Sequence, residues 1–370
     1  MQRRHLIRYG FYGLGWLSLE SLMGCEQRGV LSISGQSLLS GCDDRKGNHY
    51  ISRFSSAGGL QYMVPVPQRV HDSTVIPRVN KAVFVARRPG NHTYVIDLKS
   101  GELIQTLESQ SGRHFYGHGF VSASQEYLFL AENHYQDGKG LIGVYRVDEK
   151  LEKVSEFSSY GVGPHQILLL SDQKTAVVAN GGLHTHPAQG RDILNLNTMA
   201  SNLVYIDINS GQLLESWQPP NQKMSIRHLS VGRDDRVVCG VQHQGDLGES
   251  VPLVGSHYRG QEINWLRCPE SIRLQMRQYT ASVAVNSTAS HALVSCPRGN
   301  LITLWDLHQQ RYRHSVPCKD AAGLVACPQG HWLASGGFGD FIKLSIESEG
   351  LVKQSLGKFP VRWDNHACLV

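Results

Sequence analysis

Histidine, a common metal ligand and general base, recurs in this 370-residue chain at one position of a repeated pattern. Five histidines stand just before or at the start of an apolar run, in "VHDSTVIP", "GHGFVSA", "PHQILLL", "RHLSVG" and "NHACLV"; they are His71, His118, His165, His228 and His366. The first two steps, from His71 to His118 and from His118 to His165, are both 47 residues long. We therefore treat these five histidines as candidate metal ligands.

Two more candidate ligands, His184 and His186, stand in "LHTHP" at the start of a long insertion. Imidazole nitrogens that share a zinc ion lie only about 3 to 4 Å apart, so not all seven histidines can bind one ion. Two or three from neighbouring repeats could do so, helped by His184, His186, His134 or Glu132. Nitrogen ligands without thiolate suit copper, iron or zinc, and Glu132 favours iron.

Polar residues follow the second apolar run of several units, where we expect loops on the same face as the histidines. These candidate ligand-binding residues are Arg87, Arg88, His134, Gln242 and His243. An alternation of histidine and arginine also suits an anionic substrate clamped over a channel. A third interpretation is structural, because WD-repeat propellers place a Gly-His pair at the same position, as "YGHGFVS" does here, without any ligand.

The sequence contains seven similar units. Five open with the apolar runs that begin at these histidines, and the other two open with "ASVAVN" and "AGLVACP". Each complete unit continues with a second run, such as "TAVVANG", and most add a third, such as "LVYIDI". Repeats of about 40 to 50 residues with four short strands are typical of a β-propeller. The sequence thus predicts an all-β, seven-bladed β-propeller over residues 37–370, whose histidine-bearing strands line a central channel.

The last unit has only its first run, "HACLV", while "SLLSGCDD" and "HYISRF" near the other end lack a first run. We expect the N- and C-terminal strands to pair and to complete one blade, which closes the ring. Cys42 and Cys368 would lie on neighbouring strands of that blade. Whether they form a disulfide is left open.

The N-terminus has features of an export signal. Arg3 and Arg4 precede a moderately apolar stretch that is too short and too polar to span a membrane, so residues 1–24 are predicted to be a twin-arginine signal. The sequence "SLMGC" resembles a bacterial lipobox, in which Cys25 is lipidated, and residues 25–36 would form a linker. We expect a periplasmic protein whose membrane contact, if any, is this lipid anchor.

Composition excludes some functions. The net charge of +5 is small for this length and the basic residues are scattered, so no nucleic-acid partner is expected. The eight cysteines form no C-x-x-C pair, which excludes a zinc ribbon.

The segments "GPHQILLLSDQKTAVVANGGLHTHP" and "ILNLNTMASNLVYIDI", together with "SIRHLSVG" and the export signal, resemble the bacterial domain-of-unknown-function family 1513. The resemblance implies an exported propeller whose gene often neighbours those of imelysin-like periplasmic iron-uptake proteins. It therefore implies a role in iron or copper handling, with such proteins as partners. It implies no reaction, so whether the chain is an enzyme is left open.

The segment "GVGPHQ" also resembles that of lactonase-type seven-bladed propellers. By this resemblance Glu132, His165 and either Arg227 or Arg298 are candidate catalytic residues. A histidine or carboxylate base would activate water while arginine stabilises the developing oxyanion. A hydrolase and a non-catalytic platform for protein interactions are therefore the alternatives to metal binding.

Overall fold

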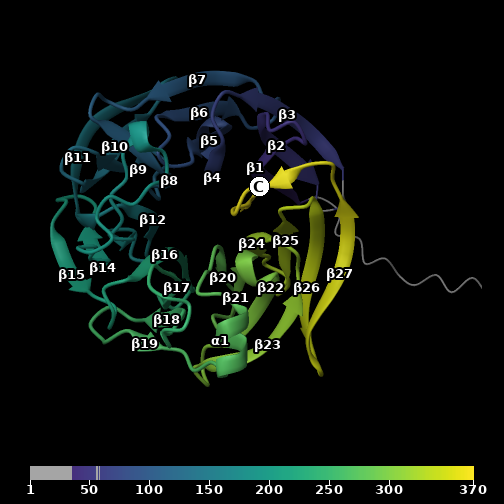
Figure 1. The fold of residues 1–370 in the computed structure, drawn as a ribbon. Coiled ribbons are helices and arrows are strands. Elements are labelled where there is room, and N and C mark those ends of the chain that lie inside the picture. The colour runs from purple at the N-terminus through teal and green to yellow at the C-terminus, as the bar shows by residue number, and fades with distance from the viewer. Residues whose placement is uncertain (1–35, 56, 58) are drawn as a thin grey trace, which may run out of the picture. The chain divides into compact units, whose positions relative to one another are not determined.

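The computed structural model describes residues 36–370, apart from residues 56 and 58. These residues form seven sheets around a central axis (Figure 1), which confirms the predicted seven-bladed β-propeller. The predicted export signal and Cys25 lie outside the described residues. In the described part of the chain, no helix is long and apolar enough to cross a membrane.

Six blades follow one another along the chain, each running from its inner to its outer strand. Blade one contains β4 (Val70–Ile76), β5 (Lys81–Ala86), β6 (His92–Asp97) and β7 (Leu103–Glu108). Blade two contains β8 (Arg113–Val121), β9 (Tyr127–His134), β10 (Lys139–Val147) and β11 (Leu151–Val162). Blade three contains β12 (Pro164–Leu169), β13 (Thr175–Asn180), β14 (Asn202–Asp207) and β15 (Leu213–Trp217).

The next three blades repeat this order, although the outer strands of blade four are short. Blade four contains β16 (Met224–Val231), β17 (Val237–His243), β18 (Val254–His257) and β19 (Asn264–Trp265). Blade five contains β20 (Val283–Val285), β21 (His291–Cys296), β22 (Leu301–Asp306) and β23 (Arg311–Pro317). Blade six contains β24 (Ala321–Ala326), β25 (Trp332–Gly336), β26 (Asp340–Glu347) and β27 (Gly350–Lys358).

Blade seven joins the two ends of the described chain. Its strands are β1 (Ser37–Asp43), β2 (His49–Ser55), β3 (Leu60–Val66), β28 (Arg362–Trp363) and β29 (Cys368–Leu369). Because β1 pairs with both β28 and β29, the C-terminus lies beside β1 near the centre of the ring (Figure 1). The predicted closure is therefore confirmed. Both Cys42 and Cys368 carry free thiols.

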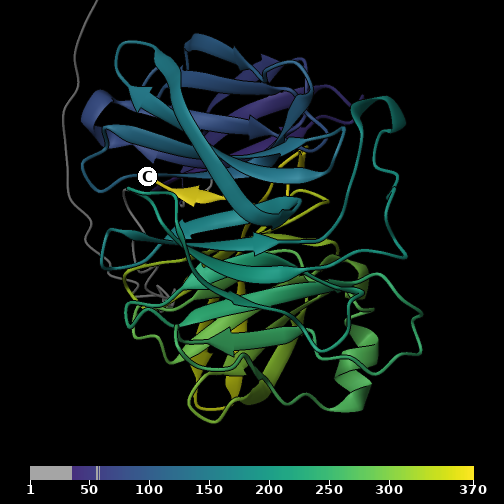
Figure 2. The ribbon, with the colours of Figure 1, turned by 90° about the vertical axis from the view of Figure 1, so that its left-hand side faces the viewer.

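Helices in the described residues are short. They are the 3-10 helices η1 (Pro77–Val79), η2 (Pro187–Gln189) and η3 (Pro297–Gly299), and the α-helix α1 (Glu270–Gln275). In the side view of the ring, α1 (green) and the insertion that carries η2 (teal) project from the same face (Figure 2).

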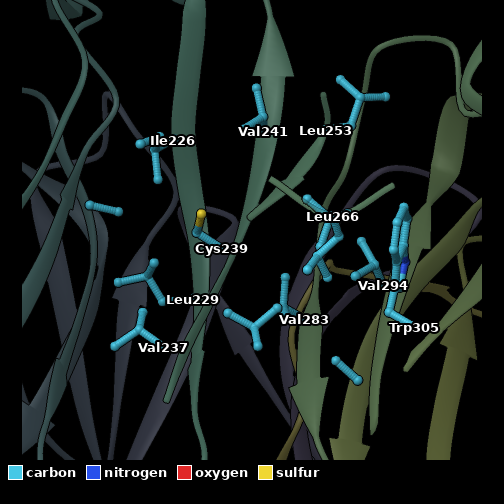
Figure 3. Close-up of a cluster of buried hydrophobic side chains, with 14 of the residues drawn as sticks. Ile226, Leu229, Val237, Cys239, Val241, Leu253, Leu266, Val283, Val294 and Trp305 are labelled. Atoms are coloured by element: carbon cyan, nitrogen blue, oxygen red, sulfur yellow. The ribbon is translucent and has the colours of Figure 1, made fainter. Parts of the chain in front are cut away.

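The core lies between neighbouring blades. Successive side chains of a strand point to opposite faces of its sheet, and each sheet is covered on both faces by the next blades. Second strands such as β5, β13 and β21 are therefore buried almost throughout, whereas the outer strand β7 is largely exposed. Figure 3 shows one such cluster, in which Leu229, Cys239, Val283 and Trp305 pack together. This packing fixes the inner strands around the axis.

Candidate metal centre

The five repeat histidines lie together at the axis of the ring. We call them the histidine cluster: His71, His118, His165, His228 and His366. The ring centroid of His118 lies 4.5 Å from that of His366, 4.8 Å from that of His165 and 4.9 Å from that of His71. All five side chains are buried, with exposed fractions of 1 to 7%. Histidines separated by up to 295 residues of sequence thus share one small volume.

Irregularities in the inner strands aim three of these side chains at the axis. The register of each inner strand against its neighbour shifts at His71, at His165 and beside His118, so these residues fall outside the regular pairing. Such bulges re-aim a side chain that would otherwise point into the sheet interface. Gly117 adds space, because a Cβ there would lie 2.6 Å from Cδ2 of His71. In β16 the bulge falls at Arg227.

Two overlapping groups of three histidines could hold a metal ion. Within each group the ligand nitrogens all lie within 4.8 Å of one another; the groups are His71, His118 and His366, and His118, His165 and His228. Within the cluster, the buried ring nitrogens without a hydrogen-bond partner among the described residues are His118 Nε2, His165 Nδ1, His228 Nδ1 and His366 Nε2. Buried polar atoms normally have partners, so four such nitrogens in one place fit a bound ion. The described histidines could hold a metal.

Two aspartates orient the rings of His71 and His118. His71 Nδ1 donates to Asp364 Oδ1 and His118 Nδ1 donates to Asp72 Oδ2, each over 2.7 Å. These bonds place the proton on Nδ1 and leave the Nε2 lone pair free for a metal. Carboxylates in this position fix the ring orientation and increase the basicity of a metal-binding histidine. The Asp364 carboxylate also accepts from Arg69 and Arg87, over 2.6 and 2.9 Å.

Burial keeps four of the five cluster histidines neutral. It lowers the pKa of His71, His165 and His228 well below 6.5, and it lowers that of His366 to about 4, with a further contribution from His118. Asp364 opposes the shift at His71 without cancelling it. Since metals bind the unprotonated ring, these imidazoles are ready to bind at neutral pH.

A small cavity borders the cluster, and we call it the arginine cavity. Its lining comprises His71, Arg87, Arg88, Tyr116, His165, Arg191, Arg227, His228, Gln242, Tyr279 and Asn365. Three cluster histidines therefore face the same space as four arginines. Of the predicted ligand-binding residues, Arg87, Arg88 and Gln242 lie here.

His184 and His186 belong to neither group of three. His184 Nε2 lies 2.7 Å from the Tyr135 carbonyl oxygen, to which it can donate. His186 Nδ1 accepts from the Ala188 N–H over 3.1 Å and so caps η2. In the structure both rings make contacts that hold the insertion in place.

Glu132 is engaged away from the arginine cavity. Its carboxylate accepts from the Tyr145 hydroxyl and from Lys153 Nζ, each over 2.7 Å. It does not line the cavity, whereas His165 and Arg227 do. The three groups suggested by the lactonase resemblance are therefore not brought together around that cavity.

The remaining predicted residues have other partners. His134 Nδ1 lies 2.8 Å from Asp137, and His243 Nε2 lies 3.1 Å from Glu249. Arg298 is exposed, and its guanidinium carbon lies 4.1 Å from the centroid of the Tyr279 ring.

Some residues of the site were not predicted from the sequence: Asp72, Tyr116, Arg191, Tyr279 and Asp364. The two aspartates had a usable signal, since Asp72 directly follows His71 and Asp364 stands two residues before His366. Tyr116, Arg191 and Tyr279 had none, because they enter the site through loops or through packing around the axis.

Comparison with solved structures supports the fold. A hydrazine synthase chain of Kuenenia stuttgartiensis aligns with a TM-score of 0.62 at 14% identity, covering 83% of this chain and 92% of that one. A hypothetical selenium-binding protein of Sulfolobus tokodaii gives 0.66 at 10% identity, covering 91% and 94%. The β-propeller domain of Cps50 (Swd1) of Myceliophteria thermophila gives 0.56 at 10% identity, covering 87% and 98%. At such identities the likeness shows the fold alone.

No curated protein matched the sequence. A family model, described as a protein of unknown function (DUF1513), matches residues 64–370. The matched region includes every histidine of the cluster and both aspartates that orient it. The chain is therefore a member of the DUF1513 family.

Proposed function

We propose that this protein binds one transition-metal ion in its histidine cluster. The observation that carries the proposal is the pair of overlapping histidine groups, whose buried nitrogens include four without a partner among the described residues. His118 belongs to both groups, but with Nδ1 bonded to Asp72 it has one free nitrogen, Nε2. One lone pair binds one ion, so the groups represent alternative positions of a single ion.

Copper and zinc suit this site best. Neutral imidazole is a good ligand for both, and at a given nitrogen site copper(II) binds more tightly than zinc. A carboxylate ligand would favour iron, but the Glu132 carboxylate is bonded to Tyr145 and Lys153. Iron would therefore have to bind without Glu132.

We expect His118→Ala to abolish tight metal binding, because it removes the ligand common to both groups. Wild-type protein should hold about one ion per chain, and the variant should bind copper or zinc at least about 100-fold more weakly, given the 10-fold effect of even outer partners. Elemental analysis and competition titration with a chelator measure both quantities.

Two variants sharpen this test. His71→Ala removes one group and leaves the other, so it should weaken binding less than His118→Ala does. His184→Ala, outside both groups, should bind as the wild type does. Less than a tenth of an equivalent of metal in protein from its native source, unchanged by His118→Ala, would overturn the proposal.

The same proposal extends to the compartment. We propose that the site works in the periplasm, in iron or copper handling, with imelysin-like uptake proteins as partners and Cys25 as a lipid anchor. The Arg3 and Arg4 pair and the gene setting implied by the resemblance support this. Replacing both arginines by lysine should strand the protein in the cytoplasm, and unchanged secretion would contradict the assignment.

A further inference from the structure

The arginine cavity gathers positive charge that its lining does not neutralise. Four arginines line it, Arg87, Arg88, Arg191 and Arg227, and no carboxylate does. Arg87 has a partner outside the lining, Asp364, which it meets over 2.9 Å. The other three have no ion pair among the described residues.

Two of these arginines are buried with unused donors. Arg88 is 7% exposed and Arg227 is 3% exposed. Arg88 Nε and Nη1 and Arg227 Nε have no hydrogen-bond acceptor among the described residues. The Arg88 guanidinium lies 5.6 Å from the centroid of the Tyr116 ring, which gives it a weak cation–π contact and no countercharge.

An unpaired buried guanidinium is costly. Removing such an ion from water costs several kcal/mol unless a countercharge compensates. Burial together with Arg87 and Arg88 lowers the pKa of Arg191 to about 10. An anion between these groups would oppose that shift.

The space limits what the anion can be. As it stands, the cavity has room for about one water-sized sphere, which excludes an organic substrate and admits an oxyanion of four or five atoms only if part of the wall moves. Arg191 stands in the exposed insertion, so this wall can adjust. The planar fork of a guanidinium matches a pair of oxygen atoms, which favours an oxyanion over a halide.

We propose that Arg88, Arg191 and Arg227 bind a small inorganic oxyanion beside the histidine cluster. The site needs no metal, because the arginines supply the charge. A second consequence rests on the proposed function: His71, His165 and His228 line the same cavity, so a bound cation and the anion attract each other. By linkage each then strengthens the binding of the other.

Isothermal titration of the metal-free protein with bicarbonate, phosphate and sulfate, with chloride as the comparison, tests the site itself. At least one oxyanion should bind more tightly than chloride. Arg227→Met and Arg191→Met should each weaken that binding at least about tenfold, since each removes charge-assisted hydrogen bonds. Arg191→Met changes an exposed residue and so leaves folding intact.

Arg298→Met is the matched control, because Arg298 contacts the Tyr279 ring but does not line the cavity. It should bind the oxyanion as the wild type does. Equal affinity for chloride, no binding of any oxyanion, or equal affinity in the Arg191 and Arg227 variants would overturn the proposal.

A second arm separates this site from the metal site. In metal titrations, the protein should bind the metal at least about fivefold more tightly when the oxyanion is present than when it is absent. Fivefold is the lower end of the usual coupling between two sites. His118→Ala should keep the oxyanion site while losing the metal. Oxyanion binding in a protein that never binds metal would support the anion site and refute the metal function.

Discussion

Acidification below about pH 6.5 is expected to unfold the metal-free propeller. Burial lowers the pKa values of His71, His165, His228 and His366 in the folded state, whereas in the unfolded chain they return to about 6.5. Below that pH the unfolded state therefore binds more protons than the folded one. Stability is then present above the unfolded pKa and is lost as the pH falls.

The expected loss of stability is large because the four buried histidines act together. Each contributes up to about 1.4 kcal/mol per pH unit, so the loss approaches roughly 5 kcal/mol per unit between pH 6 and the folded-state values. A folded domain has only about 5 to 15 kcal/mol in all. The charged groups facing the cluster do not titrate in this window; they are Asp72, Asp364, Arg87, Arg88, Arg191 and Arg227. The pKa of Asp72 is lowered to about 2, Arg87 and His71 hold the pKa of Asp364 well below its usual value, and arginine stays protonated.

Urea denaturation in the presence of a chelator, at half-unit steps from pH 7.5 to 5, measures this slope. His165→Gln should remove one titrating group and lower the slope by about a quarter of its value. His134→Gln, at a histidine outside the cluster that is paired with Asp137, is the comparison variant. Saturating metal should shift the loss of stability to lower pH, since the bound ion stabilises the unprotonated rings. A flat profile between pH 7 and 5 would contradict the expectation.

Replacing Asp364 by asparagine is expected to weaken both the fold and the metal site. The Asp364 carboxylate is fully buried and accepts from His71, Arg69 and Arg87. Asparagine keeps the size but removes the charge, which deprives Arg87 of its ion-pair partner, whereas Arg69 keeps Asp43 at 3.3 Å. Breaking a buried ion pair from one side costs about 3 to 5 kcal/mol. Loss of the carboxylate behind a ligand histidine costs about 10- to 100-fold in metal affinity.

Denaturant unfolding and metal competition titration measure the two effects separately. Asp137→Asn is the matched control, because it breaks a His–Asp pair of 2.8 Å with His134 at a largely exposed position. That change should cost less than about 1 kcal/mol and should leave metal affinity unaltered. If Asp364→Asn lowered stability but bound metal as tightly as the wild type, Asp364 would be structural only.

The local sequence was sufficient to predict the blades. Inner strands at "VHDSTVIP" and "PHQILLL" match β4 and β12, and the incomplete last unit correctly predicted that the two ends share blade seven. These predictions depend on the alternation and spacing of neighbouring residues, which a single sequence displays. The regular 47-residue step also indicated that His71, His118 and His165 occupy equivalent places in successive blades.

The contents of the site were predictable only in part. Equivalence in the repeat predicted five histidines on inner strands. His184 and His186, in an insertion outside the repeat, were also predicted as ligands, with Glu132 as a possible helper, and the structure bonds all three to other groups. Loop residues follow no repeat, and their side chains find partners according to the packing around them. Nothing local indicated that Lys153 and Tyr145 would occupy the Glu132 carboxylate.

The sequence alone therefore determined the strands, their order, the ring and the identity of its innermost histidines, because each follows from a short-range pattern. Only the tertiary structure decided which nitrogens converge, which carboxylates orient them and which arginines face them. Closure of the ring places Asp364 against His71, 293 residues apart, and bulges one residue long set where the rings of His71 and His165 point. Contacts of this kind depend on the packing of all seven blades around one axis, which no local stretch of sequence encodes.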